Sequence, residues 1–128
     1  MKKIITLLIL LSSVCSCTKQ REETLPINFN KYEIHINHEA QEIDLFAKRN
    51  FMLSGASGST SRELSQRKCV CIGPWFKVVG PGSNGTSKTL QIKVDENDSD
   101  TTRILTVYVI RKERDEQLRV YQEGRSIN

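Results

Sequence analysis

Two of the four cysteines, Cys69 and Cys71, are separated by a single residue. On an extended strand they would point the same way, with Cα atoms about 6.6 Å apart. That distance is at the long limit for a disulfide, and parallel Cβ vectors are unfavourable for one. We therefore expect unpaired thiols in the core. A disulfide, which an oxidising compartment favours, and a metal-binding or reactive site are the alternatives.

The first segment of the chain has the layout of a secretory signal peptide. Two lysines precede an apolar run, Ile4–Leu11, and small residues follow it. The apolar run is too short to span a bilayer as a stable helix. We therefore expect residues 1–16 to be a signal peptide that is removed.

The end of this segment, Val14-Cys15-Ser16-Cys17, resembles the lipobox of bacterial lipoproteins. Cys17 fits the motif better than Cys15, because Val14 and Ser16 then fill its two most demanding positions. The resemblance implies that the Cys17 thiol carries diacylglycerol and that the new amine is acylated too, with fatty acids such as palmitate. More than one acyl chain gives durable anchoring. An ordinary signal peptide with incidental cysteines is the alternative.

Residues 17–26 are predicted to be the lipidated Cys and a polar tether. The paired acids Glu22-Glu23 resemble export signals of Bacteroidetes lipoproteins that direct the protein to the outer face. We therefore expect a lipid anchor in the outer membrane, with the protein facing either the surface or the periplasm.

Length and charge narrow the possible partners. The chain has 128 residues, which is enough for one domain, and a formal net charge of +4. Removal of Lys2 and Lys3 leaves +2 (4 − 2). Because the remaining basic residues are interleaved with acids, a nucleic-acid partner is poorly supported.

The C-terminal half predicts strands. Apolar and polar residues alternate in Leu90–Val94, Ile104–Tyr108 and Leu118–Gln122, which places one set of side chains on a buried face. The segments Gly80–Thr86 and Asp95–Thr102 are rich in Gly, Asn, Asp and Ser, which are typical of turns.

Shorter strands are expected earlier in the chain, at Phe29–Asn37, Ile43–Ala47, Arg67–Ile72 and Trp75–Val79. The Ser/Gly-rich stretch Ser54–Ser61 is expected to be a loop. Together these elements predict an all-β, immunoglobulin-like antiparallel β-sandwich of about seven strands. A small β-barrel is the alternative. The sandwich would occupy residues 27–124, followed by a tail at 125–128.

The chain is identified by its motifs as resembling the BACON domain, a Bacteroidetes-associated, often N-terminal module described as carbohydrate-binding. The marks occur in the family's order: Trp75, Gly85, Leu90-Gln91-Ile92-Lys93-Val94, Asn97, Arg103 and Val120-Tyr121-Gln122-Glu123-Gly124. The first half departs from the family, which often has Gly-Gly at Glu39-Ala40 and Asn-Trp at Asn50-Phe51.

The resemblance implies an immunoglobulin-like module in an envelope lipoprotein that binds carbohydrate or mucin glycans, or acts as a spacer. It also implies that Trp75 belongs to the core, although its ring could serve as a sugar platform. No binding motif carries over residue by residue.

An outward stripe on the predicted strands is the best candidate contact surface. It contains Tyr108 and Tyr121, together with Ile104 and Ile110. A neighbouring strand or partner domain that covers it is the alternative. A second candidate, Asp100-Thr101-Thr102, resembles the short O-glycosylation motif of Bacteroidetes and would make Thr101 the acceptor.

Neither a metal site nor an enzyme is expected. His35 and His38 would point apart at the end of a strand, and no third ligand is evident. No catalytic constellation and no cofactor motif is apparent in the sequence. The leading expectation is a non-catalytic lipoprotein that binds glycans or a partner protein at the envelope. A passive spacer or assembly subunit is the alternative.

Overall fold

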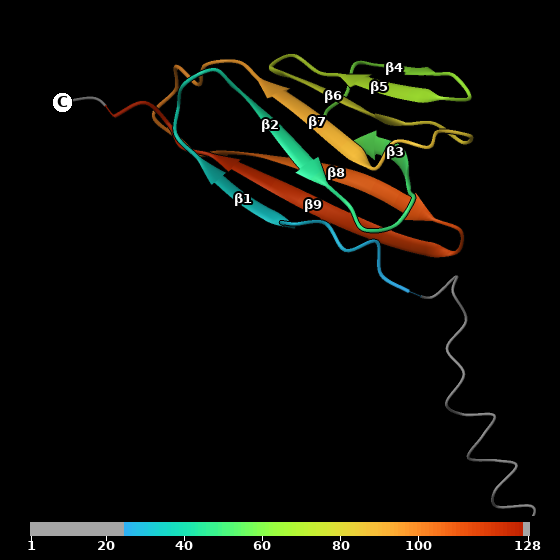
Figure 1. Cartoon of the computed structure of the whole chain (residues 1–128). Helices are drawn as coiled ribbons and strands as arrows, with labels where there is room; N and C mark the ends of the chain where they lie inside the picture. Colours follow the sequence, from blue (N-terminus) through green and yellow to red (C-terminus); the bar gives the residue numbers. More distant parts are fainter. Residues whose placement is uncertain (1–24, 127–128) are drawn as a thin grey trace, which may run out of the picture.

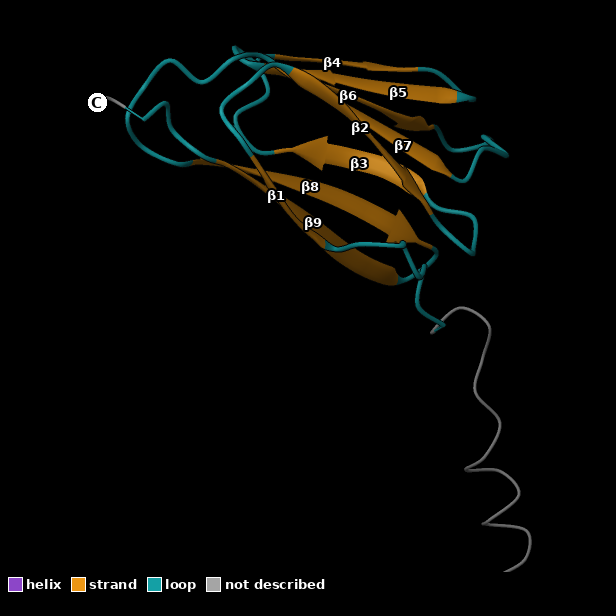
Figure 2. Cartoon of the chain, turned by 60° about the vertical axis from the view of Figure 1, so that its left-hand side comes forward, coloured by secondary structure: helices purple, strands orange, loops and turns teal. Residues whose placement is uncertain are grey.

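The structure is a computed structural model that describes residues 25–126, and these residues form two β-sheets packed face to face (Figures 1 and 2). One sheet has the strand order β1-β9-β8-β3 and the other has β2-β7-β6-β5-β4. The strands are β1 (Glu33–Ile36), β2 (Gln41–Phe46), β3 (Met52–Ala56), β4 (Ser61–Leu64), β5 (Lys68–Ile72), β6 (Phe76–Pro81), β7 (Thr89–Val94), β8 (Arg103–Arg111) and β9 (Arg114–Gln122). The predicted all-β sandwich is confirmed.

The core lies between the two sheets because every second side chain on the long strands points inward. The inward residues of β7, β8 and β9 are almost fully buried, as their alternation predicts. The core consists of Ile27, Phe29, Ile34, Leu45, Phe51, Leu53, Cys69, Cys71, Phe76, Val78, Leu90, Ile92, Val94, Leu105, Val107, Val109, Leu118 and Val120. All of it lies within residues 27–120.

The first and last strands pair in parallel, which corrects the expectation of an entirely antiparallel sandwich. Ile34 of β1 is opposite Val120 of β9, and the register continues to Ile36 and Gln122. After β1 the chain crosses to the other sheet, so β1 and β9 both run from the same end of the molecule. All the other strand pairs are antiparallel.

The described residues contain nine strands rather than about seven, because the Ser/Gly-rich stretch is not simply a loop. Its first residues continue β3 as far as Ala56, which pairs with Val107. Its last residue begins β4, which pairs with β5 and has only exposed side chains. A strand whose side chains are all exposed shows no alternation of buried and exposed residues, so only its backbone pairing identifies it.

The sandwich has two distinct ends (Figure 1). We call the end where the described chain begins the entry end; it includes Leu25–Lys31, Ala47–Phe51 and the turn between β8 and β9. The opposite, far end includes Asn37–Ala40, Asp95–Thr102 and the last described residues. Residues 25–126 include no helix that is long and apolar enough to cross a membrane.

Candidate functional site

The outer face of the four-stranded sheet carries the residues of the predicted stripe. On β8, Ile104 and Tyr108 are 53% and 40% exposed, and Ile110 is half-buried. Tyr121 on β9 lies directly opposite Ile104. Residues opposite each other on neighbouring strands are in side-chain contact range. The structure therefore brings Tyr121 and Ile104 together, with Tyr108 further along the same strand.

The stripe extends onto β1 through a stacked ring pair, which we call the Tyr121–His35 stack. The parallel register places His35 beside Tyr121. Their ring centroids are 4.7 Å apart and the ring planes differ by 6°. His35 Nε2 lies 3.2 Å from Glu33 Oε1, and the His35 side chain is 67% exposed. Since β1 is an edge strand, the imidazole lies at the border of the sheet with its outer side toward solvent.

Polar groups surround the Tyr121–His35 stack. A hollow of about 260 Å³ lies beside it, lined by Tyr32, Glu33, Gln117, Arg119 and Tyr121. The Arg119 guanidinium and the Gln117 amide are hydrogen-bond donors, and the Glu33 carboxylate is an acceptor, so a ligand in the hollow can be offered both. A flat ring beside convergent donors and acceptors suits a ligand that has both an apolar surface and hydroxyl groups.

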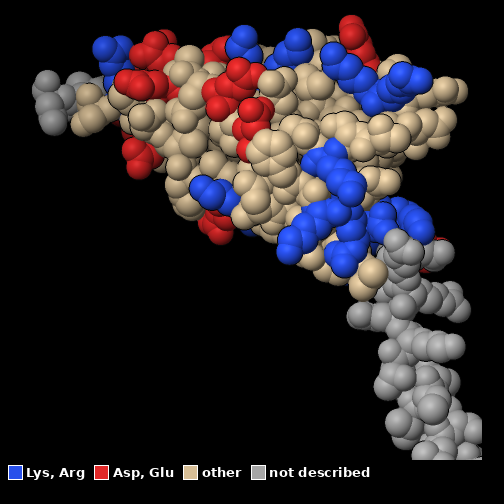
Figure 3. Space-filling model, viewed as in Figure 1, with Lys and Arg blue, Asp and Glu red and all other residues tan. Residues whose placement is uncertain are grey.

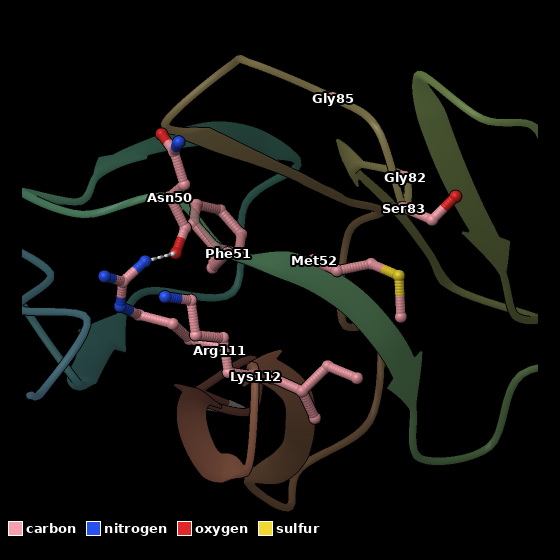
Figure 4. Close-up of a pocket in the computed structure, with 9 residues that line it drawn as sticks. Asn50, Phe51, Met52, Gly82, Ser83, Gly85, Arg111 and Lys112 are labelled. Atoms are coloured by element: carbon pink, nitrogen blue, oxygen red, sulfur yellow. Dashed lines mark hydrogen bonds between the residues drawn. The ribbon is translucent and has the colours of Figure 1, made fainter. Parts of the chain in front are cut away.

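A larger groove of about 430 Å³ lies at the entry end (Figure 4). It is lined by Asn50, Phe51, Met52, Gly82, Ser83, Gly85, Ile110, Arg111 and Lys112. Arg111 Nη1 donates a 3.2 Å hydrogen bond to the Asn50 carbonyl, which occupies part of that guanidinium. The two charged side chains that line this groove, Arg111 and Lys112, are both basic.

Trp75 is not a free platform for a sugar. It is half-buried and packs against the core. Its ring makes an edge contact with Phe76 at a centroid distance of 5.2 Å. The Arg103 guanidinium carbon lies 4.1 Å from the Trp75 ring centroid, a cation–π geometry. The guanidinium thus occupies a ring face that a sugar would need.

The far end is closed by a buried polar network centred on Gln122, which is 0% exposed. Gln122 Oε1 accepts a 2.8 Å hydrogen bond from Arg103 Nε. Gln122 Nε2 donates to the carbonyl oxygens of Asp95 at 3.0 Å and Glu39 at 3.3 Å. Asn97, which is 1% exposed, donates from Nδ2 to other carbonyl oxygens of the same end.

The entry end is closed around a carboxylate, Glu116, whose side chain is 9% exposed. It accepts hydrogen bonds from the Tyr32 hydroxyl, the Ile27 amide at 3.0 Å and Arg114 Nε at 2.6 Å. Burial works to raise the pKa of Glu116. The hydrogen bonds outweigh burial, so the pKa lies below its ordinary value.

Cys69 and Cys71 are buried, unpaired thiols on β5, as the sequence predicts. Both are 0% exposed and point toward the core. Burial raises the pKa of the Cys71 thiol to about 11, and the neighbouring Cys69 adds to that increase. The thiolate is the reactive form, so the Cys71 thiol is a poor nucleophile at neutral pH.

The remaining candidates are placed as follows. Thr101 is exposed in the loop at the far end, with its hydroxyl 3.3 Å from that of Ser99. His38 is half-buried in the turn after β1 and does not join His35 on the outer face. Within residues 25–126, no group of three His, Cys, Asp or Glu side chains is placed to hold a metal ion. Cys17 lies outside the described residues.

Sequence reasoning missed the polar and imidazole groups around Tyr121. Glu33 and His35 alternate with Ile34, so the period of the strand indicates that they point outward. The pairing of β1 with β9 cannot be predicted from the period of either strand, and it is this pairing that places His35 beside Tyr121.

Comparison with known proteins supports the fold. No family model and no curated protein matches the chain, so the BACON resemblance stays a prediction. A solved NMR structure of a protein from Bacteroides thetaiotaomicron is similar, with a TM-score of 0.58 and 17% identity, covering 87% of this chain and 99% of that one. A Bacteroides ovatus GH5 xyloglucanase in complex with a XXXG heptasaccharide matches with a TM-score of 0.45 and 18% identity, covering 79% of this chain and 20% of the enzyme.

Proposed function

We propose that this chain is a non-catalytic outer-membrane lipoprotein whose β-sandwich binds carbohydrate, including mucin glycans, at the cell envelope. The Val14–Cys17 motif supports the anchor. The observation that carries the binding proposal is the Tyr121–His35 stack, with the exposed His35 imidazole at the sheet edge and the polar hollow beside Tyr121.

The chemistry of this face suits sugars. The apolar face of a sugar ring packs on an aromatic ring, and its hydroxyls need both donors and acceptors within reach. Arg119 and Gln117 supply donors, and Glu33 supplies an acceptor. The hollow is small and lies on an open sheet face, so the ligand would be an extended glycan chain that lies along the face.

A glycan array probed with the chain from Thr18 onward tests the binding proposal. We expect His35→Ala and Tyr121→Ala to weaken binding at least about tenfold, on the order of 1.4 kcal/mol or more. Phe46→Ala is the matched control, because Phe46 is 57% exposed on the other sheet. Absence of binding to all host and dietary polysaccharides, or an equal loss in the control, would contradict the proposal.

Metabolic labelling with a fatty acid tests the anchor separately. Label should enter the wild-type chain and should be absent from Cys17→Ala. Equal incorporation in both would overturn the assignment of Cys17 as the lipidated residue.

A passive spacer or assembly subunit is the second candidate function. The exposed Ile104 and Tyr108 favour it, because exposed large apolar and aromatic side chains are typical of protein contacts. Co-purification with a fixed set of envelope proteins that is lost in Tyr108→Ser, together with a negative glycan array, would favour this function.

A further inference from the structure

Basic side chains gather around the start of the described chain, and acidic side chains are more frequent at the opposite end (Figure 3). The entry end carries a group that we call the basic patch: Lys48, Arg49, Arg111, Lys112 and Arg114. The same end also carries Lys31 and three acids, Glu113, Asp115 and Glu116, which leaves a balance of +3 (6 − 3). The patch is therefore basic overall, although it is not free of acidic groups.

The far end has the opposite sign. Its acids are Glu39, Asp95, Glu96, Asp98, Asp100 and Glu123, and its basic residues are Arg103 and Arg125, a balance of −4 (2 − 6). The side chains of Glu96 and Asp98 are 48% and 78% exposed. The described domain thus has a positive end and a negative end along its long axis.

The basic patch surrounds the place where the described chain begins. Arg49 Nη1 donates a 2.7 Å hydrogen bond to the Pro26 carbonyl, and the Lys48 amide donates to the Asn28 carbonyl at 3.0 Å. On the other side, Arg114 is bonded to Glu116, which accepts from the Ile27 amide. The exposed ammonium groups of the patch belong to Lys48 and Lys112.

The length of chain before Leu25 limits how far this end can lie from a membrane. Seven residues, Thr18–Thr24, separate Cys17 from Leu25. Even a fully extended chain of that length spans at most about 29 Å from Cys17 to Leu25. A lipid on Cys17 would therefore hold the entry end, and not the far end, next to the bilayer.

We propose that the basic patch binds the anionic headgroups of the membrane that anchors the chain, a proposal that rests on the proposed lipid anchor. Basic residues close to an anionic surface are attracted to it, within a Debye length of about 8 Å at physiological salt. The acidic far end is repelled by the same surface. The domain stands with its long axis away from the membrane, which leaves the outer face of the four-stranded sheet accessible.

Vesicle binding by the unlipidated chain from Thr18 onward tests this proposal independently of the anchor. That chain retains every strand and core residue described. We expect it to bind phosphatidylcholine vesicles that contain phosphatidylglycerol and not to bind vesicles of pure phosphatidylcholine. The bound chain should dissociate as the salt concentration is raised.

Two charge-reversal pairs locate the contact. Lys48→Glu with Lys112→Glu should weaken binding to the anionic vesicles at least about tenfold. Lys77→Glu with Lys93→Glu is the matched control, since both lysines are exposed and adjacent on the five-stranded sheet and the net charge changes equally. The control pair should retain most of the binding. Urea unfolding of both variants would verify that each remains folded.

Three outcomes would overturn the proposal: no binding of the wild-type chain to anionic vesicles at low salt, equal binding to pure phosphatidylcholine, or equal loss in the two charge-reversal pairs. None of them bears on Cys17, because the tested chain lacks it. Failure of fatty-acid labelling would in turn remove the anchor while leaving the vesicle result intact.

Discussion

The two ends of the sandwich are both closed by buried polar side chains of β9, but by different chemistry. At the far end, Gln122 and Asn97 bond backbone groups through neutral amides. At the entry end, Glu116 does so as a carboxylate. Amides do not titrate, whereas a carboxylate that is held ionised makes its end sensitive to pH. The comparison indicates that the closure of the far end does not depend on the ionisation of its polar side chains, whereas the closure of the entry end depends on pH.

The largest effect is expected from Gln122→Leu at the far end. Leucine fills a similar volume but leaves Arg103 Nε and the Glu39 carbonyl without their amide partner, whereas the Asp95 carbonyl keeps its bond from Arg103 Nη2. Each unsatisfied buried group costs about 1–3 kcal/mol, so we expect a loss of about 3 kcal/mol or more in the free energy of unfolding. Urea denaturation would measure it.

Gln117→Leu is the matched control for that variant, because Gln117 is exposed on the same strand. Its effect should lie within about 0.5 kcal/mol. A similar small effect from Gln122→Leu would show that the far end is not closed by its amide.

A smaller effect is expected from Glu116→Gln at the entry end. The glutamine side chain retains one acceptor oxygen but loses the negative charge of the carboxylate to which Tyr32 and Arg114 donate hydrogen bonds. We expect a loss of about 1–2 kcal/mol at neutral pH, measured by urea denaturation.

The pH dependence of the same variant sharpens the contrast between the ends. Because the pKa of Glu116 is lower in the folded chain than its ordinary 4.5, its stabilisation is complete above that value. The stabilisation is lost as the pH falls from the ordinary value through the folded value. Glu116→Gln should therefore lose less stability on acidification than the wild type. If the wild type and Glu116→Gln lost the same stability on acidification, the closure of the entry end would not depend on the ionisation of Glu116.

Among the variants that alter the closure of either end, the smallest effect is expected from Tyr32→Phe. The phenylalanine keeps the ring contact with Phe29 but loses the hydroxyl that bonds Glu116, at a cost of about 1 kcal/mol. Burial raises the pKa of Tyr32, and the hydrogen bond to Glu116 adds to this. The wild type should therefore lose stability as the pH rises above 10.0, the ordinary Tyr pKa, and Tyr32→Phe should lose less. Thermal unfolding across alkaline pH would measure the difference.

Local periodicity was sufficient to predict the strands that make the core. Leu90, Leu105 and Leu118 alternate with polar residues and are all 0% exposed. Gln122 continues the buried set of β9, so even its inward position follows from the period. The prediction of a loop for the Ser/Gly-rich stretch was wrong at its end, because β4 is an exposed edge strand whose side chains show no buried pattern.

The candidate site was predictable only in part, because its partners come from distant segments. Tyr108 and Tyr121 follow from the outward period of their strands. The stack needs the pairing of His35 with Tyr121, and the entry end needs Tyr32 beside Glu116, 84 residues apart. Such pairings are set by the packing of the whole sandwich, which the sequence of one strand does not contain.

The parallel pairing of β1 with β9 has a mechanical consequence. A pulling force that acts between the N-terminal side of β1 and the C-terminal side of β9 would run along both strands. The backbone hydrogen bonds that join Glu33–Ile36 to Arg119–Gln122 would then be sheared together, instead of being peeled open one at a time. A domain loaded in this direction resists extension with all its terminal hydrogen bonds at once.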